Sequence, residues 1–393
     1  MLRGLPFEYA VRNLGRTPSR LFMSVCGSAL VVVLVIAAGG FVHGMTSALR
    51  SSGSPRNVIL LGAGSEESIE RSEIPMRTAA IAAASLSGIK RMAGVEAISP
   101  EIYLALPVTI AQEGRDMDDP GKLAVVRGVL PAAFMVHQGV RIASGQMPQS
   151  GSNQVAVGRL AARSLGYEPP ETILGTSLIF DEILFEATGI LDADGGVAEG
   201  EIWMPLNDLQ VVAQRDSLSC VVMTMNSEDI SEAEAFAVRR LDLEIIAERE
   251  TAYYATLSAF FGPIRVMVLI TAILIAAGGI VGGLNTVYAA FASRVREIGA
   301  LQTIGYSRMA IVRSLIEESL LSASIGALIA AAIGLLFLDG LVIRFSMGVF
   351  GISVSPEVLA IGLGAGLLLG IIGAVVPAVR CLRLPIPEAL RSN

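Results

Sequence analysis

Four runs of apolar residues without a single charged side chain stand out along the chain: 21–42, 266–293, 319–338 and 358–379. About 20 helical residues cross the ~30 Å hydrocarbon layer of a bilayer. The pattern therefore predicts four transmembrane helices, at 21–44, 263–292, 319–338 and 358–379. The composition agrees, because 53% of the residues are hydrophobic and the mean hydropathy is +0.63, which is too apolar for an ordinary soluble chain.

The first run has an alternative interpretation as a signal peptide. A positively charged leader precedes it, and the small residues 37–40 end it. The apolar core of a signal peptide usually has only about 7–15 residues, and this run is longer. The leader is also long, because it occupies residues 1–20. We therefore interpret the run as a membrane helix that stays in the protein.

Arginine residues indicate the orientation of the helices, because short loops rich in Arg and Lys remain cytoplasmic. They cluster before the first helix (Arg3, Arg12, Arg16, Arg20), between the second and third (Arg294, Arg296, Arg308, Arg313) and after the fourth (Arg380, Arg383, Arg391). Segments 1–20, 293–318 and 380–393 are therefore predicted to be cytoplasmic. The insertion 45–262 and the loop 339–357 then lie outside.

The outer insertion is acidic. Residues 45–258 carry 16 Arg and Lys against 29 Asp and Glu, a net charge of −13 in a chain whose total is −7. Such a domain is a poor candidate for binding nucleic acid or anionic lipid headgroups.

Helix and strand patterns alternate within this insertion. Thr78 can cap a helix over about 79–93, and Ser231 with Glu234 forms a capping-box pattern for a helix to about Leu241. Strands are predicted at 102–111, 123–130, 153–158, 183–191, 201–206, 219–226 and 243–248, with one more helix near 158–166. The predicted fold class is an α-helical membrane protein with four transmembrane helices and a large α/β extracytoplasmic domain between helices one and two. We expect an α/β part at the two ends of this domain and a β-rich part in its middle.

The cytoplasmic segment 293–318 combines charge with helical periodicity. Its apolar residues recur every three to four positions, at Val295, Ile298, Leu301 and Ile304, and then at Met309, Val312 and Leu315 with Ile316. This spacing predicts two amphipathic helices in a charged elbow between membrane helices. Gly305 suits a left-handed backbone at the end of the first helix, and Ser307 can cap the second.

Residues that support chemistry are scarce. His43 and His137 are the only histidines, so a multi-histidine metal site cannot be built from this chain, and both are predicted at a surface or an interface. The pairs Asp118/Asp119 and Asp192/Asp194 lie in Gly- and Pro-flanked turns, where solvated carboxylates are expected. The cysteines, at positions 26, 220 and 381, are predicted to lie too far apart to form a disulfide. We predict no catalytic, cofactor-binding or metal-binding residue, and therefore a subunit that is not an enzyme.

A phosphate-binding loop is also missing. Such a loop needs a lysine after glycine and before Ser or Thr, and neither Lys90 nor Lys122, the only lysines, meets this requirement. If ATP drives this protein, another chain binds the ATP and its Mg²⁺.

Glycines recur in the membrane helices. The fourth has Gly362, Gly366, Gly370 and Ala374 at four-residue spacing, and the second has Gly278 and Gly282, offset by one from Gly279 and Gly283. Ridges of small residues let helix backbones pack closely, although membrane helices are also glycine-rich in general. The four runs contain no ionisable residue of the kind that marks an ion or proton pathway.

Several motifs resemble MacB/FtsX-type permeases, the membrane subunits of mechanotransmitting ABC transporters. They are Arg296-Glu297-Ile298-Gly299 with Leu301, Gly305, Glu318 and Gly326, the amphipathic segment 9–30, and the C-terminal PAVRCLRLPIPEALRS (377–392). In the insertion, the segments 126–134, 153–167 and 187–210 are similar to the family's extracytoplasmic domain. One departure is Glu168-Pro169-Pro170, where many members have a Gly-Asp turn.

The resemblance implies a bacterial inner-membrane protein with both termini in the cytoplasm. Two permease subunits, as a homodimer or a heterodimer, would join cytoplasmic ABC ATPase subunits, and a periplasmic adaptor would join an exporter. It further implies that the elbow contacts the ATPase through Arg294, Arg296, Glu297, Ile298, Gly299, Leu301, Gly305 and Glu318. The alternative for the elbow is an amphipathic helix that lies on the inner leaflet.

The function implied is mechanotransmission, in which ATP hydrolysis in a partner moves the outer domain to export or extract a substrate. The alternative is an FtsX-like regulator that transmits ATPase motion to an extracytoplasmic cell-wall hydrolase. A membrane-anchored enzyme is disfavoured by the missing catalytic residues. The sequence does not identify the substrate, because relatives handle drugs, peptides, lipoproteins and lipids.

Overall fold

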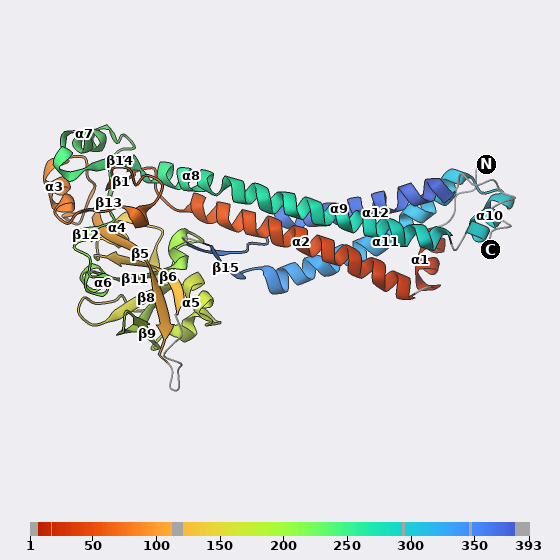
Figure 1. Cartoon of the computed structure of the whole chain (residues 1–393), viewed down its shortest axis with the longest axis horizontal. Coiled ribbons are helices and arrows are strands. Elements are labelled where there is room, and N and C mark those ends of the chain that lie inside the picture. The colour runs from red at the N-terminus through yellow and green to blue at the C-terminus, as the bar shows by residue number, and fades with distance from the viewer. Residues whose placement is uncertain (1–6, 17, 112–120, 293–294, 346–347, 382–393) are drawn as a thin grey trace. The chain divides into compact units, whose positions relative to one another are not determined.

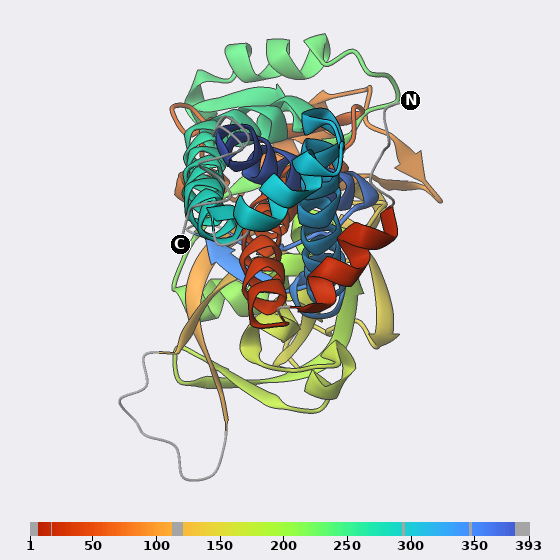
Figure 2. The same cartoon turned by 90° about the vertical axis from the view of Figure 1, so that its right-hand side faces the viewer.

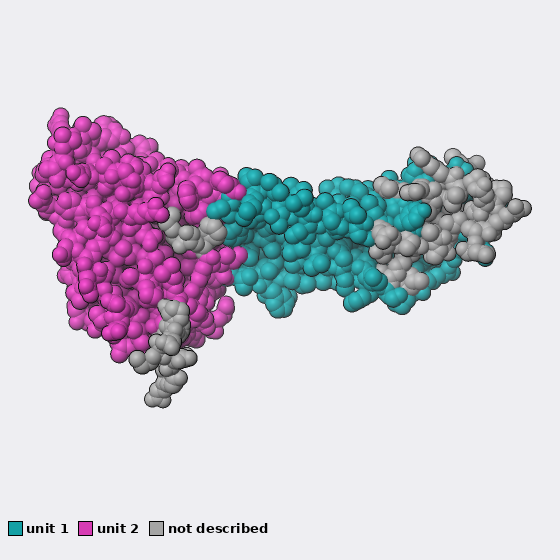
Figure 3. All heavy atoms as spheres, in the orientation of Figure 1, with its two compact units in different colours: residues 1–43, 264–341, 352–393 teal, residues 44–263, 342–351 magenta. Residues whose placement is uncertain are grey.

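The computed structural model describes residues 7–16, 18–111, 121–292, 295–345 and 348–381. The chain divides into two compact units, which Figure 3 shows in different colours. Unit 1 comprises residues 1–43, 264–341 and 352–393, and unit 2 comprises residues 44–263 and 342–351. The outer insertion therefore forms a unit of its own, together with part of the loop predicted at 339–357.

Unit 1 is built from helices (Figure 1). These are α1 (Phe7–Arg16), α2 (Pro18–Ser51), α9 (Gly262–Ala292), α10 (Val295–Thr303), α11 (Arg308–Ile333), which continues as a π-helical segment (Gly334–Leu338), and α12 (Pro356–Cys381). Helices α2 and α9 begin or end in unit 2. Within the described residues four segments are long and apolar enough to cross a membrane: Leu21–Ser51, Gly262–Gly282, Arg308–Leu338 and Pro356–Val379. The predicted number of membrane helices is confirmed.

Close contacts at glycine hold α2, α11 and α12 together. Figure 2 shows the cartoon turned so that the helices are seen end-on. A Cβ atom at Gly366 would lie 2.8 Å from the Cβ of Ala327, and one at Gly370 would lie 2.8 Å from the Cβ of Ala323, so only glycine permits this approach of α12 to α11. A Cβ at Gly362 would lie 2.6 Å from Ile36 of α2. The fourth-helix ridge therefore packs against both neighbours.

The glycines of α9 behave differently. Added Cβ atoms at Gly278 or Gly282 would meet no atom within 4 Å, whereas one at Gly279 would lie 2.4 Å from Val31 of α2. In the described part of this chain, α9 thus contacts α2 at Gly279, which belongs to the second of the two predicted glycine pairs and not to the pair Gly278 and Gly282. The reason is the 100° turn per residue, which places Gly279 on a different face from Gly278.

Unit 2 contains one ten-stranded sheet, ordered β14-β1-β13-β5-β6-β11-β8-β10-β7, with β9 paired to both β10 and β5 (Figure 1). The strands are β1 (Asn57–Gly62), β5 (Ile98–Ile110), β6 (Lys122–Val129), β7 (Arg141–Gly145), β8 (Gln154–Gly158), β9 (Ser177–Phe180), β10 (Ile183–Asp192), β11 (Glu201–Pro205), β13 (Cys220–Thr224) and β14 (Ile245–Arg249). Strand β5 pairs with β13 through 98–101 and with β6 through 102–108. This long strand therefore joins the strands from the two ends of the insertion to those from its middle.

Helices and small hairpins complete unit 2. The helices are α3 (Thr78–Ser85), α4 (Ala133–Val136), α5 (Arg159–Leu165), α6 (Leu206–Ala213), α7 (Ser231–Arg239) and α8 (Glu250–Phe260), with short 3₁₀ turns at Ile69–Arg71, Pro170–Ile173, Val197–Gly200 and Leu241–Leu243. The minor strand pairs are β2 (Ile74–Pro75) with β12 (Ser217–Leu218), β3 (Arg91–Met92) with β4 (Val95–Glu96), and β15 (Val342–Phe345) with β16 (Gly348–Gly351). The core contains Leu60, Val126, Val157, Phe180 and Ile202, all fully buried.

Some local predictions were wrong. The helix predicted over 79–93 ends at Ser85, because the chain then turns into the β3–β4 hairpin, whose turn residues Ala93 and Gly94 both have positive φ. No side-chain bond from Ser231 caps α7; the Asp229 carboxylate instead accepts a hydrogen bond from the Ser231 amide at 3.0 Å. The loop predicted at 339–357 contains the β15–β16 hairpin, and the Arg344 guanidinium donates to the Ser164 carbonyl at 2.6 Å.

Candidate functional site

The predicted elbow is a short helix, α10, that ends in a capping motif around Gly305. Gly305 has a φ of +97°, in the left-handed region that favours glycine. Its amide donates to the Gln302 carbonyl, and the Tyr306 amide donates to the Leu301 carbonyl, both at 3.1 Å. These are the two bonds of a Schellman motif. The left-handed Gly305 is therefore confirmed.

Ser307 begins the next helix as predicted. Its backbone is extended, and its hydroxyl accepts a hydrogen bond from the Ala310 amide at 3.1 Å, which satisfies one unpaired donor of the first turn of α11. The helix then continues through the predicted boundary at 318/319 to Ile333. No glycine or proline interrupts the chain between Gly305 and Gly326, so the second elbow helix and the third membrane helix are one element.

Two of the predicted coupling residues are exposed on α10. They are Arg296 and Glu297, and the Glu297 carboxylate lies 4.0 Å from the Arg16 guanidinium of α1, with both side chains about half exposed or more. Such a solvated pair contributes little stability, about 0–1 kcal/mol. Gly299 is buried and Leu301 is half-buried. Arg294 and the side chain of Ile298 lie outside the described residues.

Glu318 lies apart from the elbow. It is ten residues into α11, roughly 15 Å along the helix from Arg308. Its side chain is buried and accepts a hydrogen bond from the Asn13 side-chain amide of α1. A buried carboxylate requires such a partner because its desolvation is otherwise costly. The structure therefore gives Glu318 a contact with α1, and does not place it with the exposed residues of α10.

Among the elbow side chains that the structure describes, the large exposed apolar ones are Ile304 and Met309, which flank the Gly305 turn. Their exposed fractions are 67% and 77%. The sequence pattern included both residues in the amphipathic stripes but placed the partner contact at Val295, Ile298 and Leu301. A pair of large exposed apolar side chains beside a charged helix suits a protein contact.

A second cluster of interest, which the sequence did not reveal, is an ion network inside unit 2. The Arg127 guanidinium of β6 donates to both carboxylate oxygens of Glu201 at 2.7 Å and to Glu101 at 2.6 Å. All three side chains are at most 4% exposed. The indole N–H of Trp203 donates to Glu201 at 2.7 Å, and the guanidinium lies 4.9 Å from the ring centre of Tyr103. A paired and fully bonded guanidinium tolerates burial of this kind.

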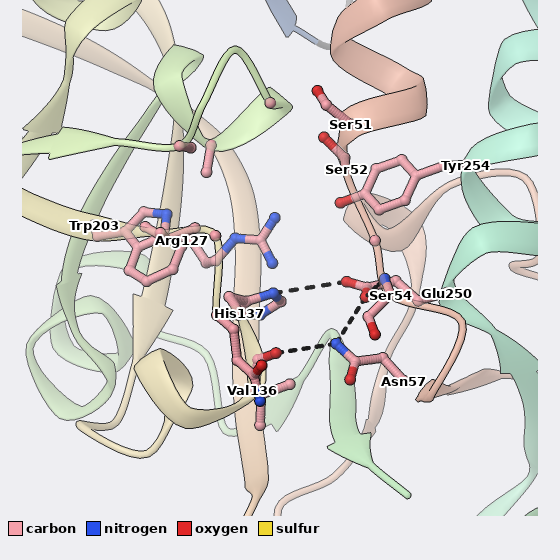
Figure 4. A pocket seen from close by; sticks show the side chains of 17 residues that line it. Ser51, Ser52, Ser54, Asn57, Arg127, Val136, His137, Trp203, Glu250 and Tyr254 are labelled. Atoms are coloured by element: carbon pink, nitrogen blue, oxygen red, sulfur yellow. Dashed lines mark hydrogen bonds and ion pairs between the residues drawn. The ribbon is translucent and has the colours of Figure 1, made fainter. Parts of the chain in front are cut away.

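His137 and Glu250 extend the network toward α8 (Figure 4). The His137 Nε2 lies 2.7 Å from Glu101, and its Nδ1 lies 3.6 Å from Glu250, the first residue of α8. Glu250 accepts hydrogen bonds from the Ser54 amide and the Asn57 side chain, both at 2.8 Å. A cavity of about 130 Å³ lies beside these groups. The network therefore ties β5, β6 and β11 to α8 and to the segment that follows α2.

The charges of this cluster shift one another's ionisation. Burial alone would raise the pKa of Glu101, but the His137 and Arg127 charges lower it to about 2. Burial alone would lower the pKa of His137, but the Glu101 and Glu250 carboxylates raise it above its ordinary value. Burial also raises the pKa of Tyr254, which lines the cavity.

Two predictions about candidate chemistry were wrong here. His137 is not a surface residue, because its side chain is only 11% exposed and bonds to Glu101. Asp192 is also buried, at the end of β10, where it accepts a hydrogen bond from Arg141 at 2.5 Å, whereas Asp194 is exposed as predicted. Asp118 and Asp119 lie outside the described residues. One sequence pattern could have indicated the ion network. Glu101 and Tyr103 are two residues apart, as are Glu201 and Trp203, so in a strand each pair lies on one face.

Comparisons with known proteins connect both units to described families. A family described as "MacB-like periplasmic core domain" matches residues 21–241, and one described as "FtsX-like permease C-terminal" matches residues 269–386. The chain is 23% identical over 406 aligned positions to the "Macrolide export ATP-binding/permease protein MacB" of Marinobacter nauticus. This alignment covers 97% of the chain and 59% of that relative, so the chain spans well under two thirds of the relative's length.

Two solved structures show weaker similarity to this chain. The periplasmic region of MacB from Actinobacillus actinomycetemcomitans gives a TM-score of 0.39 at 12% identity, covering 54% of this chain and 97% of that one. The extracellular domain of the noncanonic ABC-type transporter YknZ from Gram-positive bacteria gives a TM-score of 0.37 at 14% identity, covering 49% and 98%.

Proposed function

Because the chain belongs to the MacB/FtsX-type family of ABC transporter permeases, we propose that it is a transmembrane subunit that converts ATP hydrolysis in a partner into movement of its extracytoplasmic domain. The partner is a cytoplasmic ABC ATPase that binds ATP and Mg²⁺, and a second permease subunit completes the complex. The movement serves export or extraction of a substrate across or from the bacterial inner membrane. Both termini lie in the cytoplasm.

The observation that carries this proposal is the capped elbow. The Schellman motif at Gly305 and the cap at Ser307 fix the direction in which α10 leaves α11, so the elbow is preorganised. Arg296 and Glu297 supply exposed charges, and Ile304 and Met309 supply exposed apolar surface. A small apolar patch with charged neighbours has the composition of a protein–protein contact. We assign this surface to the ATPase.

A separate source of ATP hydrolysis agrees with the lysine content of these 393 residues. A phosphate loop needs Gly-Lys-Ser or Gly-Lys-Thr, which neither lysine of this sequence provides. The alignment with the relative named as an ATP-binding/permease protein covers 59% of that relative's length. We therefore assign ATP binding to a partner that carries such a loop.

In this proposal, the ion network of unit 2 transmits movement from α8 and the end of α2 to the sheet. Glu250 bonds the segment after α2, at Ser54, and stands at the start of α8, which precedes α9. His137 and Glu101 connect Glu250 to the central strands. Displacements that reach α8 or the end of α2 are thus delivered to the sheet through bonded, buried groups and not through a flexible linker.

A regulator of a cell-wall hydrolase is the alternative, because FtsX-like permeases are part of the same family. Affinity purification of the complex, with identification of partners by mass spectrometry, distinguishes the two functions. An ABC ATPase together with a periplasmic adaptor supports export, and an ATPase together with a cell-wall hydrolase supports regulation. Recovery of the chain without any ATPase, under conditions that preserve other membrane complexes, contradicts both.

A further inference from the structure

Unit 2 has a second cavity, distinct from the one beside His137, with a volume of about 450 Å³. It lies at one end of the central strands, between the turn after β6, the loop after β7 and the start of α6. Cavities that hold small ligands usually measure about 300–1,000 Å³. The volume is therefore sufficient for a small organic molecule.

The walls of this cavity are apolar and uncharged. Trp203, Ala156, Val129 and Met204 are each at most 5% exposed and form its deep part, and Phe134 packs against Trp203 with ring centres 5.4 Å apart. None of the described residues that line it is Asp, Glu, Lys, Arg or His, and the polar ones among them are Gln149, Ser150 and Asn207, all exposed. A charged ligand would lose its hydration here without gaining a partner.

Hydrogen bonds hold the outer wall in place. The Asp208 carboxylate of α6 accepts from the Gly151 amide at 3.0 and 3.2 Å, and the Gln154 side chain accepts from the Gln149 amide at 3.1 Å. The Gln146 amide donates to the Thr188 carbonyl at 2.7 Å. The loop between β7 and β8 is therefore anchored at several points, and the cavity is preformed.

The indole of Trp203 also restricts the kind of ligand. Its N–H is already bonded to Glu201, so it offers the cavity its apolar ring and no free donor. Recognition then rests on shape and apolar contact, with uncharged hydrogen-bonding groups available only at the rim. We propose that this cavity is a binding site for an uncharged aromatic or alicyclic small molecule, whose polar group, such as a hydroxyl or amide, points to the rim. The site is independent of the coupling role proposed above.

Trp203 is the only tryptophan of the chain, so all tryptophan emission comes from a residue that lines this cavity. It also lines the smaller cavity beside His137, and variants at Met147 and Ser150, which line only the larger cavity, assign the quenching to one of the two. The test uses the full chain in detergent micelles and 4-bromobenzyl alcohol, whose bromine quenches an indole only on contact. Probe dissolved in the micelle does not contact Trp203. We expect saturable quenching that the unbrominated benzyl alcohol reverses by competition. The anionic analogue 4-bromobenzoate should bind at least about tenfold more weakly, because the cavity offers its charge no partner.

Two variants and one control complete the experiment. Met147→Glu introduces a charge into the half-buried wall, and Ser150→Phe fills the mouth from an exposed position; each should weaken binding by at least about tenfold. Leu184→Glu, at a 54% exposed side chain outside the cavity, should bind as the wild type does. An unchanged emission maximum confirms that each variant is folded. Linear, unsaturable quenching with the same slope in wild type and Ser150→Phe, or equal quenching by 4-bromobenzoate, overturns the proposal.

Discussion

The Tyr306 amide donates to the Leu301 carbonyl at 3.1 Å, a bond that spans the left-handed residue Gly305. Gly305→Val should break this arrangement, because a β-branched residue at positive φ is strained by about 1–3 kcal/mol. We expect hydrogen exchange of the Tyr306 amide to accelerate by about 5- to 150-fold. Gly305→Asn is the matched control, since asparagine tolerates this conformation and should exchange almost as slowly as wild type. Equal protection in the Val variant would show that the motif does not determine the elbow.

The Arg127 network predicts a large stability difference between two arginines of unit 2. Arg127→Met leaves Glu101 and Glu201 buried without their cation, which should cost about 3–5 kcal/mol of unfolding free energy. Arg141→Met removes a cation that is itself 64% exposed and leaves Asp192 with Arg159 at 3.7 Å, so its loss of unfolding free energy should be much smaller than that of Arg127→Met. Urea unfolding followed by Trp203 emission measures both. Similar losses in the two variants would contradict the assigned burial.

The same network predicts how unit 2 responds to alkaline pH. Burial and the Arg127 charge oppose protonation of His137, but the Glu101 and Glu250 carboxylates raise the pKa of His137 above its ordinary value in the folded state. Its stabilising contribution is therefore complete below the ordinary pKa of about 6.5 and is lost as pH rises through the folded value. As the pH rises from about 6.5 through the folded pKa of His137, we expect the urea concentration at the unfolding midpoint to fall in the wild type. In His137→Gln this midpoint should stay level over the same pH range.

Glu101 makes the stability of unit 2 fall as the pH is lowered, whereas His137 makes it fall as the pH is raised. The pKa of Glu101 falls from 4.5 to about 2 on folding, so its contribution is present above pH 4.5 and is lost as pH drops toward 2. Wild-type unit 2 should lose stability across this window. Glu101→Gln should show a shallower acid limb and a lower midpoint at neutral pH, because His137 and Arg127 lose a carboxylate partner. A steeper acid limb in this variant would be inconsistent with a depressed Glu101 pKa.

Orientation is tested by cysteine labelling in a chain whose native cysteines are replaced by serine. The arginine distribution predicts that a cysteine at position 150 is labelled by a membrane-impermeant thiol reagent in intact spheroplasts and that a cysteine at position 392 is protected. Lysis should expose both sites. Labelling at 392 before lysis would place the elbow outside the cell and remove it from any cytoplasmic ATPase.

Sequence reasoning succeeded where the determinants are local. Strand β8 was predicted within one residue because its apolar run 155–157 is bounded by polar residues and glycine, and the Gly305 and Ser307 caps depend only on their neighbours. It failed where distant segments meet. Glu101, His137 and Glu250 come from three separate parts of the chain. The hydrophobic pattern does not predict that β5, the end of α4 and the start of α8 lie together. The β15–β16 hairpin likewise depends on contact with α5, as Arg344 and Ser164 show.

The elbow's role is tested most directly by the ATPase activity of the complex. Leu301→Asp and Ile304→Asp place a charge on the proposed contact, the first at a half-buried and the second at a 67% exposed position, and Thr303→Asp adds the same charge to a neighbouring exposed polar site. All three should insert in the membrane with unit 2 folded. We expect the first two to lose ATPase co-purification or stimulated turnover, and Thr303→Asp to retain most of both. An elbow that only lies on the lipid surface predicts instead that the ATPase stays bound and stimulated, and wild-type yield and turnover in both Leu301→Asp and Ile304→Asp would contradict the coupling role.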